Sequence, residues 1–253
     1  MEQTSYKFPS EMVTLPSKGL LYPEDSLLRK GEVEMKYMTA REEDILTNQN
    51  LIQNGTVIDK LLQSLIISPI NYDDLLVGDK NAILVASRIL GYGKDYRFNF
   101  INPKTGKEEV STVDLTEIDD KQLDESKITV GKNEFSFALP VSKRNLTFKL
   151  LTHGDEVKME QELKGLEKLG GNSAFLTTRM KYTILSVDGS YDIKTVREFV
   201  DNEFLAIDSK SFRSHIKEIM PDVKLMFDYE GPDGKVVKEV PIPIGVTFFW
   251  PES

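Results

Sequence analysis

The sequence predicts an α+β fold with two halves, each holding a small helical cluster and a β-hairpin. Apolar residues in the first half recur at the three- and four-residue spacing of amphipathic helices, whereas two later regions alternate aromatic and polar residues as half-buried strands do. These two alternating regions have turns of similar composition about 130 residues apart, which indicates a weak internal duplication.

Residues 1–30 are expected to form an extended N-terminal arm. Pro16, Gly19 and Pro23 lie close together in it, and neither a helix nor an inner strand continues through that pattern. A short strand is expected to follow at about 33–38.

Helices dominate the next segment, an acidic cluster at 31–125. Thr39 and Glu42 have the spacing of a capping box, which predicts a helix from there to about Asn50. A second helix is predicted over 57–66, where one face is apolar, and Pro69 stops it.

A third helix and a hairpin complete this cluster. The helix is expected to begin at Asp79 and to end at Gly91, which tolerates a left-handed C-terminal turn. The hairpin is predicted from alternation at Tyr96, Phe98 and Phe100, followed by a Pro- and Gly-containing turn and a return strand.

The second half, 126–253, begins after a polar stretch that marks a boundary near 120–134. Its expected elements are a hairpin at 135–150, a charged helix at 152–169, a helix start at 172–173, helices around 196–204 and 212–219, a hairpin at 225–242 and an aromatic tail.

Composition excludes several classes of function. The chain carries 32 Lys and Arg against 41 Asp and Glu, a net charge of −9, and this field repels nucleic acid. Up to residue 125 there are 14 basic and 22 acidic residues, so the acidity belongs to the first half. That half should meet a neutral or basic partner surface.

No cysteine is present, which excludes disulfides and thiolate metal sites, and two histidines are too few for a multi-histidine site. The N-terminus lacks the features of a signal peptide, and no apolar run reaches the length of a membrane span. We therefore expect a soluble protein with no metal, no cofactor and no membrane partner.

The search for catalytic residues favours a non-enzymatic protein. Every Gly-Lys pair lacks the Ser or Thr of a phosphate-binding loop. The run Glu42, Glu43 and Asp44 fits a solvated first helical turn. His215 lies at the edge of an apolar stripe, as structural histidines do, but a hydrolase using His215 and a carboxylate stays open as a remote alternative. It requires an ionisable partner beside His215 in a pocket.

Two segments are candidate contact surfaces. The arm docks either on its own chain or on another subunit, and the terminal aromatic residues either fill the chain's own core or anchor a neighbour. Under the interface alternative, deletion of residues 1–22 leaves the core folded. The candidate interface residues are Leu15, Pro16, Lys18, Leu20, Leu21, Tyr22, Phe248, Phe249 and Trp250.

Three motifs carry a family resemblance, and a fourth segment at the C-terminus supports it. They are Val13-Thr14-Leu15-Pro16-Ser17-Lys18-Gly19-Leu20-Leu21-Tyr22, Met38-Thr39-Ala40-Arg41-Glu42-Glu43-Asp44-Ile45-Leu46, Arg88-Ile89-Leu90-Gly91-Tyr92-Gly93, and Pro241-Ile242-Pro243-Ile244-Gly245 with Phe248-Phe249-Trp250-Pro251. With them the chain resembles the baseplate hub proteins of T-even-type contractile-tailed bacteriophages.

The resemblance implies a structural or assembly component of the baseplate hub, with other phage hub or tail proteins as partners and no small-molecule substrate. A hub assembly chaperone absent from the mature virion is the alternative. The expected location is the host cytoplasm during assembly, and the tail baseplate if the protein is retained. Some relatives carry Cys-x-x-Cys in the two hairpin turns, whereas this chain has 102–106 and 231–234 without cysteine, so no zinc is expected.

Overall fold

The computed structural model describes residues 9–168, 174–231, 234–244 and 246–249. Helices and small antiparallel sheets alternate along the chain, which confirms the α+β prediction. The helices are α1 (Ala40–Leu46), α2 (Gln49–Gln53), α3 (Val57–Leu65), α4 (Val77–Tyr92), α5 (His153–Lys168), α6 (Phe175–Thr183), α7 (Ile193–Glu198) and α8 (Ala206–Ile219). The strands are β1 (Ser10–Thr14), β2 (Glu32–Lys36), β3 (Asp95–Ile101), β4 (Glu108–Asp114), β5 (Phe135–Ala138), β6 (Asn145–Phe148), β7 (Ile184–Val187), β8 (Met226–Glu230) and β9 (Val236–Pro241).

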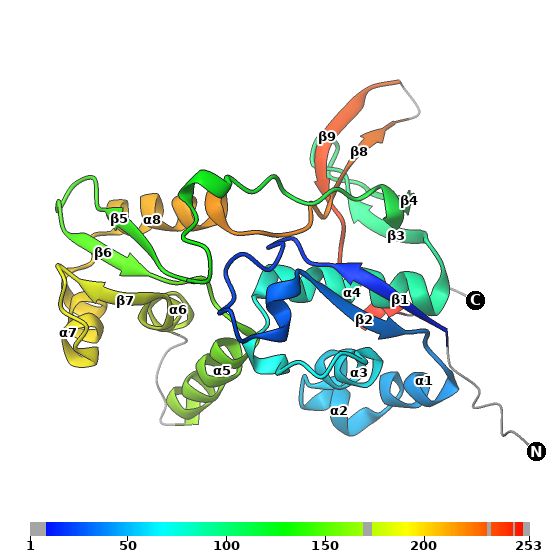
Figure 1. Ribbon diagram of the computed structural model, residues 1–253. Coiled ribbons are helices and arrows are strands. Elements are labelled where there is room, and N and C mark those ends of the chain that lie inside the picture. The colour runs from blue at the N-terminus through cyan, green and yellow to red at the C-terminus, as the bar shows by residue number, and fades with distance from the viewer. Residues whose placement is uncertain (1–8, 169–173, 232–233, 245, 250–253) are drawn as a thin grey trace, which may run out of the picture.

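The strands form four separate antiparallel sheets among the described residues: β1–β2, β3–β4, β5–β6–β7 and β8–β9. Figure 1 shows α4 near the centre of one end of the molecule, with β1–β2 beside it and α1 to α3 below. The β5–β6–β7 sheet lies at the other end with α6, α7 and α8 around it. Its third strand, β7, is an element that the sequence patterns do not reveal.

A side-chain cap sets the start of α1 where the sequence predicts it. The Glu42 carboxylate accepts the Thr39 N–H at 3.0 Å and the Thr39 hydroxyl at 2.6 Å. The helix ends at Leu46 instead of near Asn50, because the Asn48 side chain accepts two N–H groups in the first turn of α2 and starts a new helix.

Glu42 itself differs from the expected solvated residue. It is fully buried, and it also accepts hydrogen bonds from Lys36 Nζ and Ser64 Oγ, each at 2.8 Å. Burial alone would raise the pKa of Glu42, but the hydrogen bonds from Lys36, Thr39 and Ser64 outweigh burial and lower it to about 2. Glu43 and Asp44 are exposed as expected.

The next two helices follow their apolar patterns with small shifts in their ends. In α3, Val57, Leu61, Leu62 and Leu65 are buried, as the periodicity predicts. The following helix, α4, begins at Val77, two residues before the predicted start. It continues through Gly91, and Gly93 instead takes the left-handed φ of 84° after its end.

Both aromatic hairpins are present, and they pack on each other. Rings of Phe98 and Phe100 on β3 face Phe227 and Tyr229 on β8. The Phe98–Phe227 and Phe100–Tyr229 centroids are 5.2 and 4.8 Å apart, both in edge-to-face geometry. The β8–β9 hairpin projects from the body above β3–β4 (Figure 1).

This contact crosses the predicted boundary at 125/126. The C-terminal hairpin and tail follow the second half in sequence but pack against the first half in space. In the remaining part of 126–253, α8 packs on the β5–β6–β7 sheet. Phe212 on α8 lies 5.0 Å from Phe148 and 5.8 Å from Phe137 between ring centroids.

Candidate interaction site at the N-terminal arm

In the described part of the arm, Ser10–Thr14 form the extended strand β1, and the residues that follow up to Asp25 fold into a series of tight turns. Backbone bonds join Lys18 N–H to Leu15 C=O at 2.8 Å and Tyr22 N–H to Gly19 C=O at 3.2 Å. Lys18 and Gly19 both have left-handed φ angles, of 51° and 73°. A Cβ atom on Gly19 would lie 2.4 Å from the Arg29 carbonyl oxygen, so only glycine fits there.

One buried carboxylate holds the arm against α4. Asp79 is fully buried in the first turn of that helix. Ser17 donates its N–H to Asp79 Oδ1 at 2.9 Å and its hydroxyl to Oδ2 at 2.6 Å, and Tyr22 donates its hydroxyl to Oδ2 at 2.6 Å. The Tyr22 oxygen in turn accepts the Leu76 N–H at 2.9 Å. We call Ser17, Tyr22 and Asp79 the arm latch.

Burial controls the ionisation of the arm latch. It raises the pKa of Asp79 to about 6, although the donors Ser17 and Tyr22 favour the charged carboxylate and limit the rise. The pKa of Tyr22 is also raised, first by burial and then by the adjacent Asp79 charge. The phenol is therefore a permanent donor at neutral pH.

The start of α4 is also the point where distant segments meet. Its Val77 N–H donates to the Leu151 carbonyl at 3.1 Å, and Asn81 donates to the Asp222 side chain at 3.0 Å. A Cβ atom on Gly78 would lie 1.7 Å from the Pro221 carbonyl oxygen. The arm latch thus connects the N-terminal segment to a junction that includes both halves of the chain.

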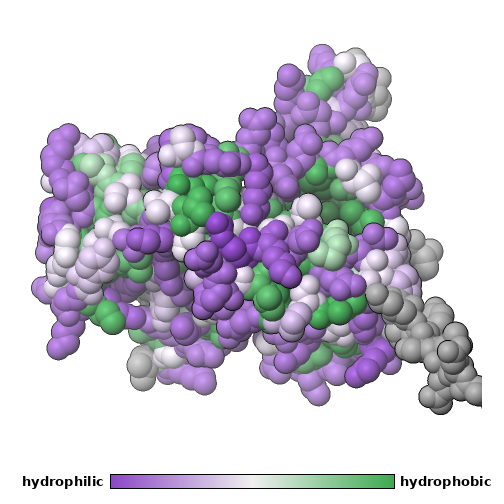
Figure 2. Space-filling model, viewed as in Figure 1, coloured by the Kyte–Doolittle hydropathy of each residue, from purple (hydrophilic) through white to green (hydrophobic). Residues whose placement is uncertain are grey.

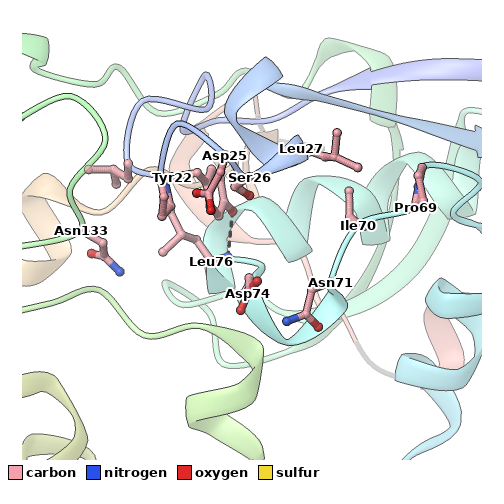
Figure 3. Close-up of a pocket in the computed structure, with 12 residues that line it drawn as sticks. Tyr22, Asp25, Ser26, Leu27, Pro69, Ile70, Asn71, Asp74, Leu76 and Asn133 are labelled. Carbon is pink, nitrogen blue, oxygen red and sulfur yellow. Dashed lines mark hydrogen bonds between the residues drawn. The ribbon is translucent and has the colours of Figure 1, made fainter.

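On its outer side the arm lines an open groove of about 560 Å³, the arm groove. Figure 3 shows its two walls, one from the arm and one from the segment that leads into α4. The lining residues are Leu21, Tyr22, Pro23, Asp25, Ser26, Leu27, Pro69, Ile70, Asn71, Asp74, Leu76 and Asn133. Leu27 is 43% exposed and the carboxylates of Asp25 and Asp74 are exposed, so the groove offers apolar surface beside negative charge.

The structure separates the candidate arm residues into two groups. Leu15, Pro16, Leu21 and Tyr22 are buried in their own chain. Their burial makes these residues part of the core, so we expect, contrary to the interface alternative, that residues 1–22 are needed for folding. The other group remains accessible: Lys18 is exposed and pairs with Glu125 at 2.7 Å, and Leu20 is half-buried.

Of the two alternatives for the aromatic tail, the described residues show the first, packing into the chain's own core. Phe248 and Phe249 are at most 1% exposed, and the Phe248 ring lies 4.7 Å from that of Tyr96. Arg88 Nε donates to the Phe248 carbonyl at 2.9 Å, while its other nitrogens bond the Gly93 and Asp95 carbonyls. These two aromatic residues therefore fill the chain's own core. Trp250 lies outside the described residues.

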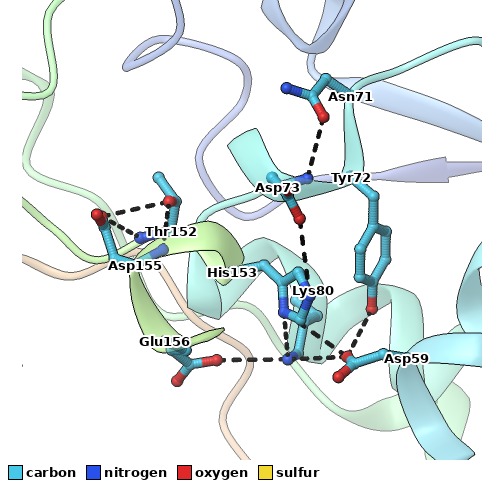
Figure 4. Close-up of polar contacts among 9 residues, drawn as sticks. All are labelled: Asp59, Asn71, Tyr72, Asp73, Lys80, Thr152, His153, Asp155 and Glu156. Atoms are coloured by element: carbon cyan, nitrogen blue, oxygen red, sulfur yellow. Dashed lines mark hydrogen bonds and ion pairs between the residues drawn. The ribbon is translucent and has the colours of Figure 1, made fainter. Parts of the chain in front are cut away.

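His153, at the start of α5, belongs to a structural polar network (Figure 4). Its Nδ1 lies 3.1 Å from Lys80 Nζ, which also approaches Asp59 at 3.2 Å and Glu156 at 3.3 Å. Tyr72 donates to Asp59 at 3.0 Å. Burial and the Lys80 charge lower the pKa of His153, so its neutral ring accepts a hydrogen bond from Lys80 and joins α5 to α3 and α4.

His215 shares a surface pocket with Glu218, whose carboxylate charge acts on its ring. It also lines a pocket of about 480 Å³, and its ring stacks on Phe137 with centroids 4.6 Å apart. Burial lowers its pKa. Within the described parts of the chain, no side chain forms a hydrogen bond or ion pair with the His215 ring. The stacking is the contact of a structural histidine.

Asn102 orders the first hairpin turn. Its side-chain oxygen accepts the Lys104 N–H at 2.9 Å, its amide donates to Glu109 at 3.0 Å, and its carbonyl accepts the Gly106 N–H at 2.8 Å.

In the part of the chain that the structure describes, no three His, Cys, Asp or Glu side chains are grouped to hold a metal ion. No described helix is long and apolar enough to cross a bilayer.

Comparison with known families decides the identity. Residues 11–250 match the family described as T4 bacteriophage base plate protein. The chain belongs to this family. The match covers the arm from residue 11, both hairpins and the start of the aromatic tail, and it places this base plate protein in the phage tail among other baseplate proteins. No curated protein and no solved structure matches the chain.

Two key residues of the base plate protein were not assigned their roles from the sequence. The sequence indicates only a helix start at Asp79, and only a capping residue in a solvated first turn at Glu42. A carboxylate beside small residues at a helix start is common, and nothing in the local pattern shows that its partners lie 57 and 62 residues away. The one available signal is the clustering of Ser17 and Tyr22 in a conspicuous Pro- and Gly-containing motif.

Proposed function

We propose that this base plate protein is a non-enzymatic structural or assembly component of the baseplate hub, acting through protein–protein contacts. Membership of the base plate family carries the proposal. The resemblance of the arm and of the α1 start to hub proteins supports the hub in particular. The neighbours would be other hub or tail proteins, met in the host cytoplasm during assembly.

The arm groove is the contact surface that we assign to this function. Tyr22 and Leu21 are fixed by the arm latch and the core, so the groove is preorganised and little conformational entropy is lost when a partner binds. Asp25 and Asp74 favour a partner segment with basic residues beside an apolar one. Lys18 and Leu20, on the same arm, remain accessible.

Charge reversal in the groove tests this assignment. Asp25→Lys with Asp74→Lys should reduce the amount of the protein on hub intermediates and tails by about tenfold or more, which corresponds to roughly 1.4 kcal/mol. Glu167→Lys with Glu198→Lys is the matched control, because these carboxylates are also exposed and lie on α5 and α7. Each pair is supplied to cells infected by phage lacking the gene, and incorporation is quantified by mass spectrometry.

The outcomes separate the alternatives. Equal incorporation of both variants rejects the arm groove as the contact surface. Wild-type protein present on hub intermediates but absent from purified virions identifies the assembly chaperone instead of a retained subunit. Absence of the wild-type protein from every tail intermediate rejects the proposed function.

A further inference from the structure

A second groove lies between the two aromatic hairpins, along β4 and β8. We call it the hairpin groove, and its volume is about 490 Å³. It is lined by Ser111, Thr112, Val113, Asp114, Glu117, Ile118, Asp119, Lys224, Met226, Phe227, Asp228, Tyr229, Glu230 and Ile242. The hairpin groove is a separate surface from the arm groove, and the proposed function assigns it no role.

The hydrogen-bond phase of β3–β4 shows which backbone groups of β4 face outward. Asn102 N–H donates to the Lys107 carbonyl, and Leu115 N–H donates to the Lys94 carbonyl, each at 2.9 Å. Hydrogen-bonded and non-hydrogen-bonded pairs alternate in an antiparallel ladder. With the observed register, every second residue of β4, including Thr112, therefore turns its N–H and C=O away from β3.

The same argument applies to β8. Ile242 N–H donates to the Leu225 carbonyl at 2.9 Å, and Gly231 N–H donates to the Lys235 carbonyl at 3.0 Å. These bonds fix the phase on both sides of the irregularity in the β8–β9 ladder. The residues whose backbone groups turn away from β9 are Met226, Asp228 and Glu230, and of these the Met226 N–H already donates to the Lys224 carbonyl at 2.7 Å. Two strand edges that pair with no other described strand thus border one groove.

The charge of the hairpin groove identifies the chemistry of its occupant. Five carboxylates line it, from Asp114, Glu117, Asp119, Asp228 and Glu230, against the one cation of Lys224. The Asp114 charge is met by Lys94 at 2.6 Å, so the excess negative charge lies on the other four. Figure 2 shows that the projecting β8–β9 hairpin is mainly hydrophilic on the face in view. A second copy of this chain, with its net charge of −9, is a poor electrostatic match.

We propose that the hairpin groove binds an extended, Lys- or Arg-bearing segment of a neighbouring baseplate protein, which adds to the free edge of β4 as a strand. Backbone bonds to the outward groups around Thr112 give affinity, and the carboxylates of Glu117 and Glu230 select basic side chains. The proposal rests on the proposed function, because it takes another baseplate protein as the partner.

A pair of proline substitutions tests the added strand. Thr112→Pro removes an outward N–H of β4 without removing a bond of the β3–β4 ladder, as prolines at strand edges do. Asn99→Pro is the matched control, because Asn99 is also exposed. By the same alternation its N–H points outward, at the opposite edge of the hairpin. Thr112→Pro should lower incorporation into tails about tenfold, and Asn99→Pro should leave it within about twofold.

A charge variant keeps the test valid if a proline variant melts early. Glu117→Lys with Glu230→Lys changes exposed side chains outside the ladder, and should also lower incorporation about tenfold. Wild-type incorporation of both Thr112→Pro and this pair rejects the hairpin groove and leaves the proposed function intact, whereas absence of the wild-type protein from all intermediates rejects the function itself. A homodimer of the purified protein in light scattering that Thr112→Pro dissociates would also overturn the proposal.

Discussion

Removing one hydroxyl from the arm latch tests the energetics of the arm. In Tyr22→Phe, Asp79 loses a donor at 2.6 Å, and the Leu76 N–H loses its acceptor at 2.9 Å. A hydrogen bond to a charged group contributes about 1.5–3 kcal/mol, and an orphaned buried N–H costs about 1–3 kcal/mol. We expect the free energy of unfolding to fall by about 3 kcal/mol or more.

Urea denaturation followed by far-UV circular dichroism measures this loss. In a chain of this size, about 3 kcal/mol corresponds to a fall in Tm of roughly 6–12 °C. Tyr37→Phe is the control, because its hydroxyl bonds Glu11 at 3.2 Å on the exposed surface, and its loss should cost less than about 0.5 kcal/mol. A Tyr22→Phe protein as stable as the Tyr37→Phe protein would refute the role of the arm latch.

The loss should also depend on pH. The folded-state pKa of Asp79 is raised to about 6, so its protonation stabilises the fold fully below the unfolded value near 3.9, and this stabilisation is lost as pH rises through about 6. Above that pH the charged carboxylate depends on its donors. Tyr22→Phe should therefore be more destabilising at pH 8 than at pH 5. An equal loss of the free energy of unfolding at both pH values would contradict a charged Asp79 above about pH 6.

Three further predictions concern other parts of the fold. Deleting residues 1–22 removes the buried side chains of Leu15, Leu21 and Tyr22, each contributing about 1.5–3 kcal/mol, and should abolish the cooperative thermal transition; a sharp transition near the wild-type Tm would show that the arm is separable. Gly78→Ala places a methyl group 1.7 Å from the Pro221 carbonyl oxygen and should cost at least about 2 kcal/mol in denaturant melts, whereas Gly165→Ala, with open space around its Cβ position, should cost nothing. The pKa of Glu42 is lowered to about 2, so its contribution to the free energy of unfolding is complete above about pH 4.5 and is lost as the pH falls towards 2. The difference in the free energy of unfolding between wild type and Glu42→Gln should therefore narrow, and not widen, from pH 6 to pH 3.

Local signals explain why much of the fold follows from the sequence. The apolar face of α3 and the alternation in β3 and β8 depend on neighbours a few residues away, so the elements have the expected type and place. The capping box at Thr39 and Glu42 sets a helix start for the same reason. The end of α1 differs from the expected one because Asn48 begins a second helix at once, a competition between two local caps.

Long-range contacts explain what the sequence does not reveal. The arm contains prolines and glycines, but whether it folds on its own chain depends on Asp79, which lies 57 to 62 residues away. The tail depends on Arg88 in the same way. The strand β7 has only four residues and is recognisable mainly by its pairing with β6.

Arg88 also links the fold to the order of its synthesis. Its guanidinium bonds the Phe248 carbonyl, 160 residues later in the chain. At a synthesis rate of about 5–20 residues per second, roughly 8–32 s separate the appearance of these two residues. The partner of Tyr22, by contrast, lies 57 residues away and follows it within roughly 3–11 s. The nascent chain can therefore close the arm latch early, whereas Arg88 Nε and the Tyr96 ring at the end of α4 lack their Phe248 contacts until the tail has been made.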